Sequence, residues 1–333
     1  MPTNHMAVLA SRPVGRIRKS DFEVKEVPVP SIGEGEILVR VKVISLDPAM
    51  RGWVQDVKSY LPPVQIGEVM RAGGAGIVEA SNNPRFKVGD AVTGVFGVQE
   101  YAVSDGKAVA KVDTRLAPLE TWIGGLGMPG MTAYFGLLDV GQPKAGETVV
   151  VSAASGAVGS IVGQIAKIKG CRVVGIAGGP EKCRYVVEEL GFDACVDYKA
   201  GNLRQQLKAA CPNGIDVNFE NVGGEILDTI LPMMNLFGRV AVCGLISEYN
   251  ATEMPEGVKN FRVILVKRLR VQGLIVFDWA KRYPEGVADL VRWRDEGKLK
   301  LKEDVREGGV AKFAETVDLL FSGGNFGKLV LKV

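Results

Sequence analysis

Short apolar runs separated by polar turns make up the first part of the chain. The turn at residues 87–90 reads Lys-Val-Gly-Asp, in which glycine and aspartate favour a reversal of the chain. Short strands punctuated by such turns are typical of a compact β-barrel-like domain. The pattern therefore predicts a β-rich domain over residues 1–122. Its predicted strands lie within residues 36–46, 74–81, 90–96 and 99–104.

The pattern of apolar and polar residues changes after residue 123, where apolar runs alternate with amphipathic segments. The run at 148–154 has the continuous apolar character of a strand that is buried in a parallel sheet. Strand–helix alternation of this length predicts an α/β fold of the Rossmann type, a doubly wound parallel sheet with helices on both faces. Further strands are predicted at 172–178, 194–198, 215–223, 238–244 and 270–276, and helices at 157–169, 180–190, 202–211, 225–235 and 285–296.

The end of the chain returns to a β-like pattern. Residues 323–333 finish in the alternating run Lys-Leu-Val-Leu-Lys-Val, which we expect to rejoin the first domain. The predicted organisation is therefore a discontinuous β-rich, GroES-like barrel domain of residues 1–122 and 300–333, interrupted by a Rossmann domain of residues 123–299.

A glycine-rich turn carries the strongest chemical signal. It follows the apolar strand at 148–154 and is a variant of the dinucleotide fingerprint in which Ala154 takes the first glycine position. Glycine at the second position lets the backbone approach a pyrophosphate, and glycine at the third lets helix and strand pack closely. The N-terminus of the following helix then offers N–H groups to the phosphates. The turn that we expect to bind them comprises Ser155, Gly156, Ala157, Val158 and Gly159.

The end of the second predicted strand distinguishes between the two nicotinamide dinucleotides. An NAD site usually has an acidic residue there, about 20 residues after the fingerprint, to bind the ribose 2′-hydroxyl. This strand ends at Ile176-Ala177-Gly178-Gly179, without a carboxylate, and Lys182 and Tyr198-Lys199 follow. Cationic donors suit a 2′-phosphate, so we expect NADPH. Two alternatives to the NADPH prediction remain. Lys182 could be a solvated helix residue with no role in binding, or the neighbouring Glu181 could favour NAD.

Composition and charge exclude several classes of function. The 333 residues carry 41 basic and 38 acidic side chains, a net charge of +3, which gives no reason to expect nucleic acid or an acidic membrane as partner. No apolar run approaches the ~20 residues of a membrane span, and the start of the chain lacks the apolar core of a signal peptide. The 5 cysteines form no CxxC pair. We expect a cytoplasmic protein.

The single histidine excludes a catalytic zinc of the alcohol dehydrogenase kind. Such a site needs Cys and His ligands, but His5 is the only histidine and no cysteine precedes Cys171. The segment in which those enzymes carry their first zinc ligand reads Ile44-Ser45-Leu46-Asp47-Pro48 here. We therefore expect no metal. Ser–His and Cys–His nucleophilic mechanisms fail for the same lack of histidine.

Several segments together resemble a known family, the zinc-independent medium-chain dehydrogenase/reductases. The resemblance is to the leukotriene B4 dehydrogenase, prostaglandin reductase and alkenal double-bond reductase group, and in particular to bacterial NADPH-dependent curcumin reductases. Members of this group reduce the carbon–carbon double bond of α,β-unsaturated ketones and aldehydes with NADPH, and are usually cytoplasmic homodimers. The segments that carry the resemblance are 45–53, 66–81, 127–160, 219–224, 243–250, 272–279 and 323–333.

The resemblance also implies roles for individual residues. It implies that Lys182 and Tyr198 hold the 2′-phosphate, and that Asn325 reaches the nicotinamide end. A pocket bordered by Met128, in the turn of residues 127–130, is implied where the two domains meet. The remaining residues expected along the cofactor are Gly178, Asn221, Cys243, Gly244 and Tyr249.

Hydride attack on the β-carbon of an enone moves negative charge to the carbonyl oxygen, so catalysis needs a hydrogen-bond donor there. Tyr249 matches the tyrosine proposed for this role in the plant relatives, and we expect it to be the donor and a proton source. The alternative is that a hydroxyl of the cofactor ribose is the donor and that Tyr249 only shapes the pocket wall. Aromatic side chains that could line the substrate pocket, or simply pack in the protein, are Trp53, Tyr60, Phe277 and Trp279.

Two other functions remain open. The first is a quinone reductase of the zeta-crystallin type, which shares the fold and the cofactor but uses another acceptor. The second is a non-catalytic NADPH-binding protein, which would bind the cofactor and turn over no electrophile.

Overall fold

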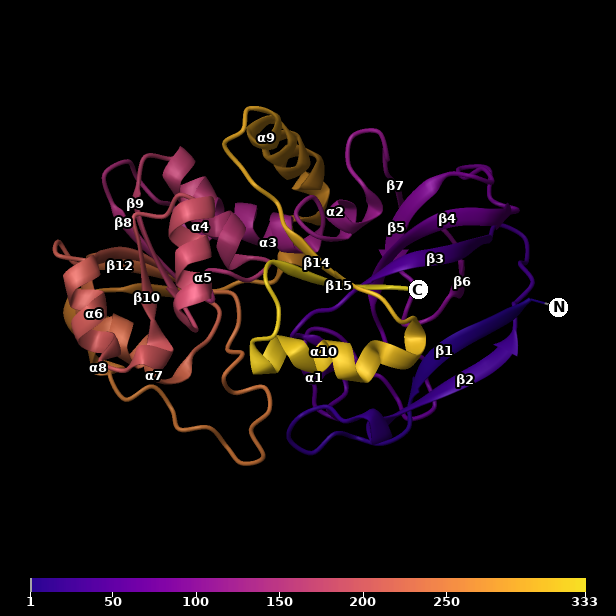
Figure 1. Cartoon of the computed structure of the whole chain (residues 1–333), viewed down its shortest axis with the longest axis horizontal. Helices are drawn as coiled ribbons and strands as arrows, with labels where there is room; N and C mark the ends of the chain where they lie inside the picture. The colour runs from indigo at the N-terminus through magenta and orange to yellow at the C-terminus, as the bar shows by residue number, and fades with distance from the viewer. Residues whose placement is uncertain (1) are drawn as a thin grey trace. The chain divides into compact units, whose positions relative to one another are not determined.

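The computed structural model describes residues 2–333, which divide into two compact units (Figure 1). Unit 1 comprises residues 2–124, Glu303–Asn325 and Leu329–Val333, and unit 2 comprises Gly125–Lys302 and Phe326–Lys328. The predicted fold class is confirmed, since unit 2 is built on a parallel sheet and unit 1 on a separate β-rich sheet. The C-terminal tail is divided between the units, with Phe326–Lys328 in unit 2.

Unit 1 is organised around β3, which pairs antiparallel with β4, β6 and β15. The sheet has the order β14-β15-β3-β4-β5-β7, and β1 and β2 form a separate antiparallel pair. Alternating Val and Ile side chains of β3 enter a core that is also filled from β15 and α10. The strands are β1 (Thr3–Leu9), β2 (Phe22–Pro28), β3 (Ile37–Ser45), β4 (Gly73–Ser81), β5 (Ala91–Val95), β6 (Tyr101–Ser104), β7 (Ala110–Lys111), β14 (Glu303–Arg306) and β15 (Lys328–Lys332), and the α-helices α1 (Met50–Trp53), α2 (Leu119–Ile123) and α10 (Phe313–Ser322).

Unit 2 is built on a parallel sheet with the strand order β10-β9-β8-β11-β12-β13. The chain first runs outward from β8 to β10 and then resumes on the other side with β11, so β8 and β11 are neighbours at the switch point. Ligands of doubly wound sheets bind outside the carboxyl ends of the strands at this point. The strands are β8 (Thr148–Ser152), β9 (Arg172–Ala177), β10 (Ala194–Asp197), β11 (Ile215–Glu220), β12 (Met234–Val242) and β13 (Arg270–Gly273).

Helices cover both faces of this sheet. Helices α6, α7 and α8 share a core with the same-face side chains Val150, Val174 and Val196, and they gather together in Figure 1. On the other face α4 contacts β8 and β9, and α3 contacts α4 and α9. The helices are α3 (Met128–Phe135), α4 (Gly159–Ile168), α5 (Pro180–Arg184), α6 (Leu203–Ala210), α7 (Gly224–Ile230), α8 (Arg262–Lys267) and α9 (Tyr283–Asp295).

Some predicted boundaries were wrong by several residues. The helix predicted at 225–235 ends at Ile230, and a 3₁₀ turn over Leu231–Met233 leads directly into β12. Pro232 explains the break, because it has no N–H to continue the helical hydrogen bonds. Tyr198, expected at the end of a strand, begins a 3₁₀ turn instead. The strand predicted at 270–276 ends at Gly273.

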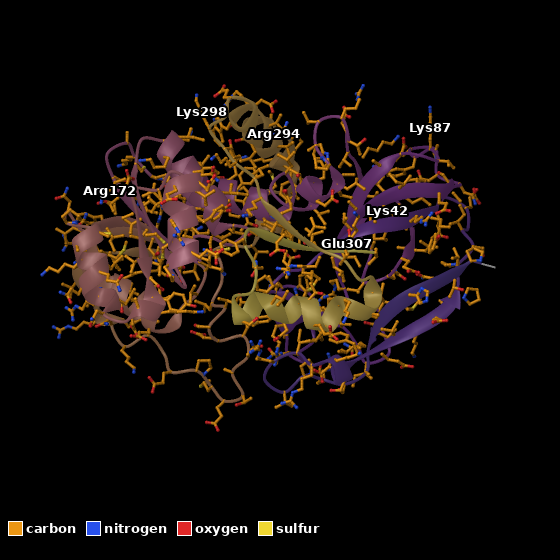
Figure 2. The ribbon with its side chains drawn as sticks, viewed as in Figure 1. Lys42, Lys87, Arg172, Arg294, Lys298 and Glu307 are labelled. Atoms are coloured by element: carbon orange, nitrogen blue, oxygen red, sulfur yellow. The ribbon has the colours of Figure 1, made fainter. Side chains whose placement is uncertain are left out.

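Charged side chains are spread over the surface of both units. Figure 2 labels Lys87 between β4 and β5, Arg172 on β9 and Lys298 after α9, and each of these residues is exposed. Among residues 2–333, no helix has the length and apolar character that crossing a membrane requires.

Candidate dinucleotide site

The turn after β8 is tight because its backbone folds back on itself. Ala153 adopts a left-handed conformation with φ of 51°, and its carbonyl oxygen accepts a hydrogen bond from the Gly156 N–H at 2.9 Å. A Cβ at Gly159 would lie only 2.4 Å from that same carbonyl oxygen, so no other residue fits there without a shift of the backbone. Helix α4 starts at Gly159, and the N–H groups of Ser160, Ile161 and Val162 donate to carbonyl oxygens of the turn at 3.0–3.1 Å. The turn and the helix dipole together suit a pyrophosphate.

The C-terminal tail holds this turn from one side. The Gly327 N–H donates to the Ser155 carbonyl oxygen at 2.8 Å, and Gly156 and Gly327 form an isolated parallel bridge. Gly327 has a φ of 63°, and a Cβ on it would lie 2.2 Å from the Lys302 carbonyl oxygen. A residue near the end of the chain therefore fixes the position of the glycine turn. No pattern in the sequence indicates this contact.

The end of β9 meets the side chains that follow β10. A Cβ on Gly178 would lie 2.9 Å from the Tyr198 hydroxyl oxygen and 3.0 Å from Lys199 Cε. Asp197, the last residue of β10, accepts hydrogen bonds at Oδ1 from the N–H groups of Gly179 (2.8 Å) and Lys199 (3.0 Å). This carboxylate, which no sequence pattern singles out, is engaged with the backbone. The side chains beside Gly178 are therefore a phenol and an ammonium.

Two lysines and two aromatic rings gather beside α5. The Lys182 ammonium lies 5.3 Å from the centroid of the Phe326 ring, and the Lys302 ammonium lies 5.2 Å from the same ring. The Tyr185 and Phe326 rings pack edge to face, with their centroids 5.7 Å apart. The Lys302 ammonium lies 4.6 Å from the centroid of the Tyr185 ring. Such cation–π contacts keep both positive charges in place near the tail. Lys302 and Phe326 were not singled out from the sequence, because their nearness to Lys182 depends on the tail reaching unit 2.

A buried carboxylate joins the ends of the central strands. Glu220 is fully buried at the end of β11, and its Oε1 accepts from Ser152 Oγ at 2.8 Å. The same oxygen accepts from the N–H groups of Val222 (2.7 Å) and Gly223 (2.8 Å). The Asn218 side chain donates to Oε2 at 2.9 Å. A buried charge with this many donors is well compensated.

Asn221 and the loop after β12 are positioned by the same strand ends. The Asn221 side chain donates to the Ser152 carbonyl oxygen at 2.8 Å. The N–H groups of Cys243 and Gly244 both donate to the Glu220 carbonyl oxygen, at 2.8 and 3.1 Å. Residues predicted along the cofactor thus follow three neighbouring parallel strands at the switch point. Burial raises the pKa of the Cys243 thiol to about 12, so this thiol is uncharged at neutral pH.

The Tyr249 hydroxyl lies over the start of this loop. Its oxygen accepts a hydrogen bond from the Leu245 N–H at 3.3 Å. A Cβ on Gly244 would lie 3.0 Å from the same oxygen, so glycine at 244 leaves room for the tyrosine. A phenol hydroxyl can accept one hydrogen bond and donate another.

The predicted substrate-pocket residues are distributed over both units. Tyr60 belongs to unit 1 and accepts a hydrogen bond from Trp53 Nε1 at 3.1 Å. Met128 begins α3, and Phe277 is 46% exposed in a 3₁₀ segment, both in unit 2. Trp279 packs within unit 2, stacked on Phe135 at 5.8 Å and bonded to Asp139 at 2.7 Å. Asn325 belongs to unit 1.

The acidic, cysteine and histidine side chains of residues 2–333 form no group of three that could hold a metal ion. His5 pairs through Nδ1 with Glu100 Oε2 at 2.7 Å, and this hydrogen bond raises the pKa of the imidazole. The carboxylates that pair with His5 lie on β2 and beside β6 in unit 1.

A β-rich unit and a parallel-sheet unit with a glycine turn at the switch point define a two-domain oxidoreductase of the dinucleotide-dependent class. Residues 5–112 match the family described as the N-terminal domain of oxidoreductase, and residues 157–293 match the family described as zinc-binding dehydrogenase. The chain belongs to the medium-chain dehydrogenase/reductase family, as its resemblance predicted.

Individual relatives match nearly the whole chain. It is 47% identical to the NADPH-dependent curcumin reductase of Escherichia coli (strain K12), over 99% of this chain and 97% of the relative. It is 41% identical to the 2-alkenal reductase (NADP(+)-dependent) of Nicotiana tabacum, over 99% of this chain and 98% of the relative. The crystal structure of CurA in complex with NADPH from Vibrio vulnificus is 46% identical, superposes with a TM-score of 0.95 and covers 99% of both chains.

Proposed function

We propose that this protein is an NADPH-dependent reductase of the carbon–carbon double bond of α,β-unsaturated ketones and aldehydes. The observation that carries the proposal is the glycine turn at the switch point, followed by a β9 end that offers Tyr198 and Lys199 in place of a carboxylate. The names of the relatives supply the reaction type. We also propose that the protein acts in the cytoplasm as a homodimer.

We propose that the following residues, all of unit 2 except Asn325, bind the parts of the cofactor. The Ser155–Gly159 turn would hold the pyrophosphate, since Gly156 and Gly159 bring backbone close to the helix start. Lys182 and Tyr198 would hold the 2′-phosphate beside Gly178. Asn221, Cys243 and Gly244 would lie along the nicotinamide half, and Asn325 would reach its end.

When bound, NADPH supplies the hydride that adds to the β-carbon of the enone. Negative charge then develops on the carbonyl oxygen, and the Tyr249 hydroxyl donates a hydrogen bond to it. The Leu245 N–H, which donates to the Tyr249 oxygen, would hold the hydroxyl at the start of the loop after β12. Transfer of the phenol proton to the α-carbon of the enolate would complete the addition of a hydride and a proton across the double bond, and a proton from water would restore the phenol.

A spectrophotometric screen at 340 nm tests the reaction type. NADPH oxidation would be followed with enones, enals, quinones and alcohols, each with and without a chelator. We expect turnover of enones and enals that a chelator leaves unchanged. Preferred turnover of a benzoquinone would instead favour a quinone reductase, and binding of NADPH without any turnover would favour a non-catalytic protein. Loss of activity with the chelator would contradict a zinc-independent mechanism.

The role of Tyr249 has its own test. We expect Tyr249→Phe to lower kcat by roughly 10- to 1,000-fold, the usual effect of removing a donor to an oxyanion. Tyr283→Phe is the matched control, since Tyr283 donates its hydroxyl to the Val276 carbonyl oxygen elsewhere in unit 2. An unchanged kcat in Tyr249→Phe would remove the tyrosine from the mechanism and favour a hydroxyl of the cofactor ribose.

A further inference from the structure

The Lys302 ammonium is held by aromatic rings and not by an acid. It lies 4.6 Å from the centroid of the Tyr185 ring and 5.2 Å from that of the Phe326 ring. Within residues 2–333 no carboxylate forms an ion pair with it, although the residue is exposed. Lys300, two residues earlier, pairs instead with Glu189 Oε2 at 3.2 Å. Lys302 thus keeps a positive charge that no acidic side chain of this part of the chain neutralises.

A second ammonium shares the Phe326 ring. The Lys182 Nζ atom lies 5.3 Å from the centroid of that ring. Lys182 and Tyr185 are three residues apart, the spacing that places two side chains on one face of a helix, and both contact Phe326 of the tail. All four residues belong to unit 2. Like charges gathered at one ring repel each other, so the arrangement gains stability when an anion joins them.

The cluster connects the two strand ends at which cofactor phosphates are expected. Phe326 directly precedes Gly327, whose N–H donates to the Ser155 carbonyl oxygen of the glycine turn at 2.8 Å. Lys182 lies on α5, four residues after Gly178, which follows β9. Because β8 and β9 are neighbouring parallel strands, the glycine turn and Gly178 lie at the same edge of the sheet. An adenosine that joins a pyrophosphate to a 2′-phosphate would span these two strand ends, with the cluster beside it.

We propose that Lys302 is a second cation of the 2′-phosphate subsite, beside Lys182, and that the Phe326 ring positions both ammonium groups. The inference rests on the proposed function, because it adds a specificity-determining residue to the proposed cofactor contacts. A phosphate monoester carries a charge of about −1.5 to −2 at pH 7, which a single lysine only partly neutralises. If Lys302 only covered the two rings with its aliphatic stem, its loss would affect every dinucleotide alike.

Calorimetric titration with NADP+ and NAD+ tests the subsite, because these dinucleotides differ only in the 2′-phosphate. We expect the natural protein to bind NADP+ more tightly. Lys302→Met removes the charge and should raise Kd for NADP+ roughly 3- to 10-fold, while Kd for NAD+ stays unchanged. Lys302→Arg keeps the charge and should restore most of the preference. Lys300→Met is the matched control, since it removes the same charge from the same segment and should change neither Kd.

Phe326→Leu tests the positioning role of the ring. It removes the aromatic face that both ammonium groups share and keeps an apolar side chain. We expect the Kd for NAD+ divided by the Kd for NADP+ to fall at least as far as in Lys302→Met. Phe326→Tyr retains a ring and should restore this ratio. A general disturbance of the tail would instead raise both Kd values and leave the ratio unchanged, which would remove the ring from the proposal.

The titrations separate this inference from the proposed reaction, because none of them depends on turnover. Equal increases of both Kd values in Lys302→Met, no increase in either, or the same effect in Lys300→Met would overturn the role of Lys302. Equal affinity of the natural protein for NADP+ and NAD+ would overturn the 2′-phosphate subsite as a whole. A protein that reduces no enone, but loses affinity for NADP+ alone in Lys302→Met, would contradict the reaction and keep Lys302 in the subsite.

Discussion

At the scale of single residues, the region after β9 decides which dinucleotide fits. Asp197 is the carboxylate nearest in sequence to the Tyr198 side chain, and its Oδ1 is already bonded to two backbone N–H groups. These two bonds hold the carboxylate against the backbone of residues 179 and 199. A 2′-phosphate would find donors in Lys182 and Tyr198. The local chemistry thus favours the phosphorylated cofactor.

Lys182→Ala should raise KM for NADPH and leave KM for NADH unchanged. Loss of one charge-assisted hydrogen bond costs about 1.5–3 kcal/mol, so KM for NADPH should rise roughly 10-fold or more. Steady-state KM for both cofactors is the measurement. Lys208→Ala on the exposed face of α6 is the control and should change neither value. Equal increases for NADPH and NADH would show that Lys182 does not contact the 2′-phosphate.

The roles of residues that depend on partners distant in the chain could not be predicted from the sequence. Glu220 ends an apolar strand, and nothing beside it indicates that it is buried. Its burial is possible because Ser152, 68 positions earlier, and the Val222 and Gly223 N–H groups supply donors. The glycine turn, in contrast, could be found because its residues are contiguous. Its fingerprint requires only a strand before it and a helix after it.

At the scale of elements, the tail and the glycine turn form one local assembly. Gly327 pairs with Ser155, and Lys328 N–H donates to the Lys302 carbonyl oxygen at 2.9 Å. Lys302, before α10, and Lys328, after it, are thus hydrogen-bonded to each other next to the turn. We infer that this assembly keeps the turn in the conformation that receives the pyrophosphate, because it removes freedom from the Ser155 carbonyl group.

Gly327→Ala should disturb that assembly. The new Cβ would sit 2.2 Å from the Lys302 carbonyl oxygen, so the tail must move away and its bond to Ser155 must lengthen. We expect weaker NADPH binding in a fluorescence titration and a Tm lower by a few degrees. Gly297→Ala is the control, since Gly297 has a similar φ of 71° but nothing within 4 Å of its Cβ position. It shares the left-handed strain, about 1–2 kcal/mol, without the clash. Unchanged cofactor binding in Gly327→Ala would contradict the role of the tail.

The existence of most elements in unit 2 could be predicted, whereas several of their ends could not. Buried parallel strands show as apolar runs, so β8, β9 and β11 were found from pattern alone. β12 begins at Met234 because its first residue pairs with Ile215 of β11, a contact that the local pattern does not encode. Boundaries depend on pairing and proline, and pairing is a property of the folded sheet.

At the scale of the whole molecule, the open edge of the unit 2 sheet is the feature that bears on assembly. β13 is an edge strand, and all its residues are exposed. Val271 on this strand is 43% exposed, and Leu265 and Val266 of α8 are 77% and 55% exposed. Exposed edges with apolar neighbours favour association with another strand. The same edge on a second copy, related by a two-fold axis, would continue the sheet.

Val271→Lys should therefore convert a dimer into a monomer. A lysine on the edge adds like charges that face each other across the two-fold axis, the device by which natural edge strands avoid pairing. Light scattering after size exclusion should give twice the chain mass of 35.7 kDa for the natural protein and the single mass for the variant. The control is Val305→Lys, because Val305 is 38% exposed on β14, the edge strand of the unit 1 sheet. That variant should stay dimeric. If both variants are dimers, the two copies meet elsewhere, and if the natural protein is a monomer, the homodimer itself is wrong.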